Sequence, residues 1–159
     1  MLPDPLGVAL ARPILRAGWR ASLSRPPGSG DALLLAQMAA QARSEECLTV
    51  VICADALDAQ RLAAELPYFE TELSACLFPD WETLPYDILS PHPDLVSERM
   101  ETLYRLFGRS GPGAEASKAE RIDVLLVSAT TALGRLPPPE FLAGRTFVFR
   151  QGQTIDPER

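Results

Sequence analysis

Three short apolar runs recur along the chain and predict the strands of a sheet. They cover residues 48–54, 73–78 and 122–127. The first run reads Leu-Thr-Val-Val-Ile-Cys-Ala and does not alternate with polar residues. An unbroken apolar run of this length is typical of a parallel strand that is covered on both faces.

Segments with helical signals lie between and around these runs. Three of them follow an aspartate, whose carboxylate can accept hydrogen bonds from the free amides of a first helical turn. These predicted caps are Asp31, Asp55 and Asp94. The first helix is apolar nearly all round and should be buried on most sides, Pro67 should end the second, and Ser128 or Thr130 should start a short fourth. The predicted helices cover residues 31–42, 55–66, 94–107 and 128–133.

Strands and helices alternate through the fourth helix, which predicts an α/β fold with a parallel sheet layered by helices. We expect residues 14–140 to form this α/β domain, although residues 14–24 fit a short helix, a strand, or one followed by the other. The proline-rich residues 1–13 are expected to be irregular. Residues 141–159 are expected to hold the truncated first strand of a following domain, because residues 146–150 alternate as a strand does.

Composition limits the location and the partners of the protein. Of the 159 residues 47% are apolar, and the net charge is −6. There is no run of about 20 apolar residues, and residues 1–15 lack a basic start followed by an apolar block, so we expect a cytoplasmic protein with no membrane contact. Only Lys118 of the 15 basic residues is a lysine, and no basic stripe for nucleic acid is visible.

One loop has the position and the glycines of a phosphate-binding loop but not its chemistry. Such a loop reads G-x-x-x-x-G-K-[ST], with a lysine for the phosphate oxygens and a hydroxyl for magnesium. The residues at the matching positions are Gly28, Ser29, Gly30, Asp31 and Ala32. Asp31 stands where the lysine belongs and would repel a phosphate, and Lys118 lies in the polar loop 108–121. We predict a degenerate phosphate loop without nucleotide, or a plain strand-turn-helix.

The remaining polar residues predict neither a metal site nor a catalytic centre. The third apolar run ends in Ser128, where a magnesium-dependent ATPase would carry paired acids, and Asp55 is better explained as a helix cap. The single histidine, His92, lies between two prolines and is predicted to be a packed or capping residue. The three cysteines lack C-x-x-C spacing and are predicted to be buried reduced thiols. We therefore expect no catalytic, cofactor-binding or metal-ligating residue.

A set of sequence strings resembles a known family. Residues 78–87 read Phe-Pro-Asp-Trp-Glu-Thr-Leu-Pro-Tyr-Asp, followed by Ser-Pro-His at 90–92, Ser-Glu-Arg at 97–99 and Leu-Tyr at 103–104. Together they closely resemble the N-terminal domain of the bacterial transcription-repair coupling factor (Mfd). The resemblance extends from about residue 14 to residue 155.

This resemblance implies a fold and a function. The family's N-terminal module looks like the excision-repair protein UvrB, with a helicase-like parallel sheet and a degenerate P-loop NTPase-type domain, and Asp31 and Ala32 fit that loss. The parent resembles a DNA-dependent ATPase translocase that displaces stalled RNA polymerase and recruits UvrA. Its ATP and magnesium would act in a downstream motor, as would its contacts with RNA polymerase and DNA.

For these 159 residues the resemblance implies a non-catalytic scaffold for UvrA recruitment and autoinhibitory packing. UvrA would bind mainly to the following domain, so no UvrA-contacting residue is assigned here. UvrB carries a DNA-clamping hairpin after the region that matches Tyr86, whereas this chain passes directly into the helix at Asp94. Two alternatives are a free-standing interaction module with a degenerate helicase fold and an unusual nucleotide hydrolase.

Overall fold

The structure of the chain is a computed structural model that describes residues 18, 20, 22–83, 88, 90–107 and 121–143. Four of the predictions therefore lie wholly or mostly outside the described residues. They concern the irregular segment 1–13, the segment 14–24, the polar loop 108–121 and the strand 146–150.

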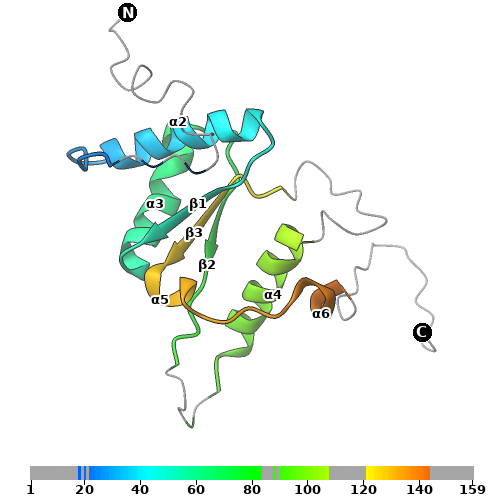
Figure 1. Ribbon diagram of the computed structural model, residues 1–159. Coiled ribbons are helices and arrows are strands. Elements are labelled where there is room, and N and C mark those ends of the chain that lie inside the picture. The colour runs from blue at the N-terminus through cyan, green and yellow to red at the C-terminus, as the bar shows by residue number, and fades with distance from the viewer. Residues whose placement is uncertain are drawn as a thin grey trace, which may run out of the picture.

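Within these described residues, three parallel strands form a sheet, which Figure 1 shows. They are β1 (Thr49–Cys53), β2 (Ala75–Phe78) and β3 (Val124–Ser128), and their order in the sheet is β1-β3-β2. Val124 is paired with Thr49 on one side and with Ala75 on the other. The predicted α/β fold with a parallel sheet is confirmed, and each strand lies within two residues of its predicted bounds.

The first face of the sheet is covered by α2 (Gly30–Ser44) and α3 (Ala56–Phe69). Every residue of α2 from Gly30 to Arg43 is at least partly buried, which confirms the helix predicted to be buried on most sides. The buried core of this face joins small and branched side chains from both helices, from β1 and β3, and from Leu73 just before β2. Its members are Ala32, Ala36, Ala39, Cys53, Ala59, Leu62, Leu66, Leu73, Val124 and Leu126.

The second face is covered by α4 (Pro93–Phe107) and α6 (Pro139–Ala143), which lie on the β2 side of the sheet in Figure 1. Phe78 and Val127 from the strands pack there against Leu103 and Leu142. The short α5 (Ala129–Ala132) follows β3 directly. No helix in the described ranges is long and apolar enough to cross a membrane.

Two predicted helix boundaries are wrong, and a proline lies at each of them. Pro67 does not end α3 but lies inside its last turn, and the helix continues to Phe69. Pro67 has no N–H to donate to the carbonyl of residue 63, so the helix lacks that one bond. The helix still closes beyond it, because the N–H of Glu70 donates to the carbonyl of Leu66 at 3.1 Å. Asp94 does not cap α4, because the helix begins at Pro93 and places Asp94 in its first turn. Proline suits this first position, where its missing N–H would have no partner in the helix.

The prediction that the first strand is covered on both faces is also wrong. The side chains of Val50 and Ile52 are 52% and 64% exposed. They point to the second face of the sheet, whereas Val51 and Cys53 point to the first. The helices of the second face pack on β2 and β3 and leave this half of β1 uncovered among the described residues.

Candidate functional site

A tight turn leads into α2 at the position of the predicted degenerate phosphate loop. Gly28 has a φ of +60°, a left-handed conformation that glycine adopts without strain. The backbone N–H of Gly30 donates to the carbonyl of Pro27 at 3.2 Å. A Cβ atom on Gly30 would lie 2.6 Å from the Cβ of Pro26, so the close approach of these two residues requires glycine.

Asp31 is not the cap of this helix, contrary to the prediction. Ser29 occupies the cap position without a side-chain hydrogen bond, and Asp31 lies in the first turn. Asp31 Oδ1 accepts a hydrogen bond from the N–H of Ala32 at 2.8 Å. The carboxylate is otherwise directed at an arginine on the neighbouring helix, and this contact draws it away from a capping geometry.

That arginine is Arg61 of α3, and it organises a cluster of five charged side chains. Its Nη2 and Nη1 atoms donate to Asp31 Oδ2 and Oδ1 at 2.7 and 3.2 Å, a two-point contact of guanidinium and carboxylate. Arg61 also binds Asp58 at 2.8 Å and Glu65 at 2.9 Å on its own helix. Arg25 adds contacts of 3.2 Å to Asp31 and 3.4 Å to Asp58. We call Arg25, Asp31, Asp58, Arg61 and Glu65 the ion-pair cluster.

The electrostatics of the ion-pair cluster oppose phosphate binding. Hydrogen bonds from Arg61 hold the pKa of the Asp31 carboxyl below its usual range, and the contacts with Asp31 and Asp58 raise the pKa of Arg61. Asp31 is therefore ionised at neutral pH. Three carboxylates face two guanidinium groups, so the cluster keeps one net negative charge at the place where a phosphate would need a cation. Ala32, at the position of the magnesium-binding hydroxyl, is fully buried and offers no oxygen ligand.

Replacing Asp31 with asparagine should lower the free energy of unfolding by about 1 kcal/mol at neutral pH, because a two-point arginine contact is lost at a partly exposed site. The folded-state pKa of Asp31 is lowered, so its stabilisation is complete above about pH 4 and disappears as the pH falls through the folded-state pKa. Urea unfolding of both proteins from neutral to acidic pH measures this difference.

The matched control for that experiment is Asp55→Asn. Asp55 caps α3 by accepting the N–H of Asp58 at 2.8 Å, as predicted, and asparagine caps a helix equally well. The control should therefore change stability little at any pH. An Asp31→Asn effect that persisted unchanged into acid would show that Asp31 does not act through its charge.

Two features bear on metal binding, namely clusters of metal-ligating side chains and the polar end of β3. No group of three or more histidine, cysteine, aspartate or glutamate side chains that could hold a metal ion occurs within the described part of the chain. Ser128 caps α5 by accepting the N–H of Thr131 at 3.2 Å, which confirms one of the two predicted starts of this helix.

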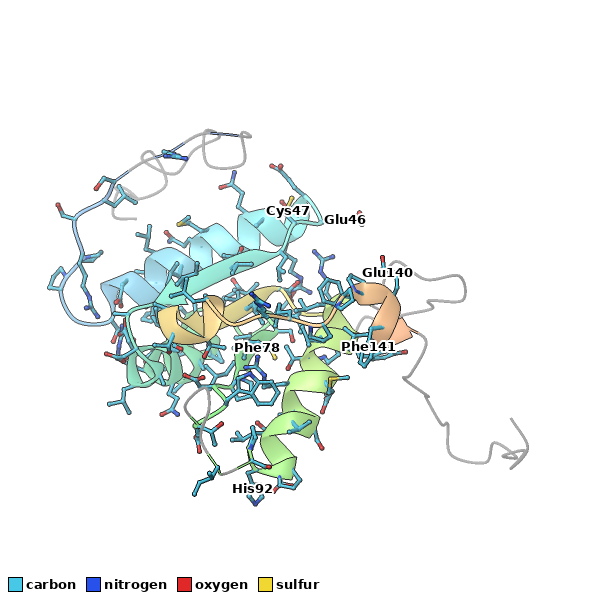
Figure 2. All side chains as sticks on the ribbon, turned by 60° about the horizontal axis from the view of Figure 1, so that its bottom comes forward. Glu46, Cys47, Phe78, His92, Glu140 and Phe141 are labelled. Atoms are coloured by element: carbon cyan, nitrogen blue, oxygen red, sulfur yellow. The ribbon has the colours of Figure 1, made fainter. Side chains whose placement is uncertain are left out.

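His92 has the capping role that was one of its two predicted roles. Its Nδ1 accepts the N–H of Asp94 at 3.3 Å, and Figure 2 shows the exposed ring at the outer end of α4. Of the cysteines, Cys53 is buried and Cys76 is half-buried, whereas Cys47 is exposed at the end of α2, so the prediction of buried thiols fails for Cys47.

The residues that carried the family resemblance meet at the carboxyl end of β2. The Arg99 guanidinium from α4 is 2% exposed and lies between two aromatic rings, 4.2 Å from the centre of Phe78 and 4.1 Å from that of Trp81. It also donates a hydrogen bond to the carbonyl of Pro79. Burial lowers the pKa of Arg99, and the nearby Asp80 partly offsets this. Figure 2 shows Phe78 in the interior, between the sheet and α4.

A second set of contacts ties this end of β2 to α5, the short helix after β3. Asp80 Oδ2 accepts the hydroxyl of Thr130 at 3.0 Å, and Asp80 Oδ1 accepts the N–H of Trp81 at 2.7 Å. Glu82 then adopts a φ of +56°, which is uncommon for a residue with a side chain. Open α/β sheets bind ligands at the carboxyl ends of their parallel strands. Here Asp80 accepts both the Thr130 hydroxyl and the N–H of Trp81, whereas the buried Nε atom of Arg99 has no hydrogen-bond partner among the described residues.

Arg61 and Arg99 are the two site residues that the sequence analysis missed. The spacing of Arg61 from Asp58 and Glu65 predicts contacts within one helix, but its contact with Asp31 joins residues 30 positions apart. Arg99 belongs to one of the quoted motif strings, and nothing in the pattern around it indicates a buried cation.

Comparisons with known proteins agree on one family. The chain is 34% identical over 129 residues to the transcription-repair-coupling factor of Haemophilus influenzae, which covers 81% of this chain and 10% of that protein. It is 34% identical over 141 residues to that of Escherichia coli, covering 89% of this chain and 11% of that protein. The factor of Rickettsia prowazekii is 30% identical over 86 residues. No family model matches the chain. The chain spans about a tenth of the length of these relatives.

Proposed function

Since the chain is homologous to the N-terminal region of bacterial transcription-repair-coupling factors, we propose that it forms this region of a factor that couples transcription to DNA repair. The parent protein is a DNA-dependent ATPase that displaces RNA polymerase stalled at a lesion and recruits UvrA for excision repair. Within it, these 159 residues act as a non-catalytic scaffold.

The ion-pair cluster is the main support for the proposed non-catalytic role. Asp31 stands at the lysine position of the loop, and Arg61 binds it at two points. An arginine that is already paired with three carboxylates has no free charge to offer a phosphate. In this proposal ATP and magnesium bind in the motor, outside this stretch of the protein.

The scaffold role assigns each partner to another part of the longer polypeptide. UvrA binds mainly to the domain that follows, while RNA polymerase and DNA bind to downstream domains. The α/β domain supplies a rigid base for the following domain and packs against the rest of the chain in the resting state. Its polar contacts at the carboxyl ends of β2 and β3 suit such a fixed surface.

Titration of the 159-residue chain with a fluorescent ATP analogue, with and without magnesium, tests the absence of a nucleotide site. We expect no saturable binding up to about 1 mM, a concentration at which even a weak site of about −4 kcal/mol would be half filled. Saturable binding that ATP competes away and that Asp31→Ala alters would contradict the proposal and favour a nucleotide hydrolase.

The size of the native gene product tests membership in a longer protein. Intact mass measured in the source cells should be several times the 17.3 kDa of this chain. The longer product should also capture purified UvrA more strongly than the 159-residue chain does, because the contact is assigned to the following domain. A product of only 17.3 kDa would refute the coupling role and leave a free-standing interaction module.

A further inference from the structure

The uncovered half of β1 is the largest departure of this sheet from the usual burial of parallel strands. Val50 and Ile52 are more than half exposed, and Leu48 just before the strand is 39% exposed. All-parallel sheets normally have both faces covered, and their strands are unbroken apolar runs for that reason. β1 has this sequence pattern but only one covered face among the described residues.

The backbone of β1 is open on the same residues. The N–H of Thr49 donates to the carbonyl of Asp123 at 2.9 Å, on the side of β3. Because backbone groups point alternately to the two sides of a strand, the N–H and C=O groups of Val50 and Ile52 point away from β3. β1 is the outer strand of the described sheet, so these groups meet no other described strand.

β1 also lacks the features that protect a true edge strand. Charges, prolines, bulges or a covering helix usually protect an edge strand from pairing with another strand. Thr49–Cys53 reads Thr-Val-Val-Ile-Cys and pairs with β3 without a bulge. The other outer strand, β2, is only four residues long, and all its side chains are at least partly buried. Sequence and burial therefore describe β1 as an inner strand whose neighbour is missing from the described residues.

We propose that the free edge of β1 binds a further parallel β-strand. Apolar side chains of the same segment cover Val50 and Ile52 on the second face of the sheet. This occupant comes from the part of the longer polypeptide that these 159 residues do not include. The chain spans about a tenth of its relatives, so ample polypeptide remains to supply it. The inference rests on the proposed function, because it requires a longer protein.

Amide hydrogen exchange of the 159-residue chain and of the longer product tests the inference. In the short chain the amides of Val50 and Ile52 should exchange rapidly, and in the longer product at least about tenfold more slowly, because they gain hydrogen-bonded partners. The amides of Val51 and Cys53, which face β3, should be protected in both proteins and serve as internal controls.

A pair of lysine substitutions separates an interface from a general effect. Ile52→Lys should leave the short chain as stable as before, because the side chain already faces solvent, but should restore fast exchange of the Val50 amide in the longer product. Leu57→Lys, at a residue of α3 that is 76% exposed, should change neither protein.

Four outcomes would overturn the inference. Slow exchange of Val50 and Ile52 already in the 159-residue chain would show that a segment of this chain itself, such as the predicted strand 146–150, binds the edge. Equally fast exchange of Val50 and Ile52 in both proteins would show that nothing binds the edge. Protection that rises with the concentration of the short chain would show that the occupant is a second copy. Equal loss of stability in both proteins on Ile52→Lys would show that the residue acts within this domain. A gene product no longer than this chain would instead refute the proposed function itself.

Discussion

Replacing Arg99 with alanine is expected to lower the free energy of unfolding by about 3 kcal/mol. The guanidinium stacks on both Phe78 and Trp81, and its removal leaves a cavity between two aromatic rings. The carbonyl of Pro79 would also lose its donor. Urea or guanidinium unfolding gives this difference directly, as a shift of the midpoint with an unchanged slope.

Two further variants test whether Arg99 acts through its volume or its charge. Arg99→Met keeps most of the apolar contact area and removes a buried charge that has no ion pair among the described residues, so it should cost only about 1 kcal/mol or less. Arg20→Ala, at an exposed arginine, should change stability by less than about 0.5 kcal/mol. If Arg99→Met were as destabilising as Arg99→Ala, the cation itself would hold the two rings together.

The strands and helices could be predicted from the sequence because each carries a local pattern. The apolar runs at 48–54 and 122–127 are set off by polar or turn-forming residues, and the structure shortens or shifts them by no more than two residues. Asp55 and Ser128 cap their helices as predicted, since a cap contacts amides only two or three residues away. Periodicity and capping are local, so a single sequence is sufficient to locate them.

The tertiary contacts could not be predicted in the same way. Nothing local indicates that Asp31 is held by Arg61 or that Arg99 lies between two rings, because these contacts join separate elements. The exposed half of β1 is a different failure. The apolar pattern of Val50 and Ile52 predicts burial, and the described residues do not provide the cover. The apolar pattern of a strand predicts that the strand is buried, but it does not identify the segment that buries it. In our proposal that segment is another part of a longer polypeptide.

The most destabilising substitution in the sheet should be Leu126→Ala, at an expected cost of about 3–5 kcal/mol. Leu126 is in the middle of the central strand, paired with Val51 on one side and Leu77 on the other, and it is fully buried under α2 and α3. Because β3 contacts both neighbours, a cavity there cannot close by the movement of one outer helix. Thermal and urea unfolding should both report the loss.

Leu133→Ala is the matched control, because it removes the same atoms from a side chain that is 88% exposed just after α5. It should change the free energy of unfolding by less than about 0.5 kcal/mol. The comparison also tests the scaffold role. If Leu126→Ala cost less than about 1 kcal/mol, the sheet would be able to relax around the cavity. A sheet that relaxed so readily would be a poor rigid base for the domain that is proposed to follow it.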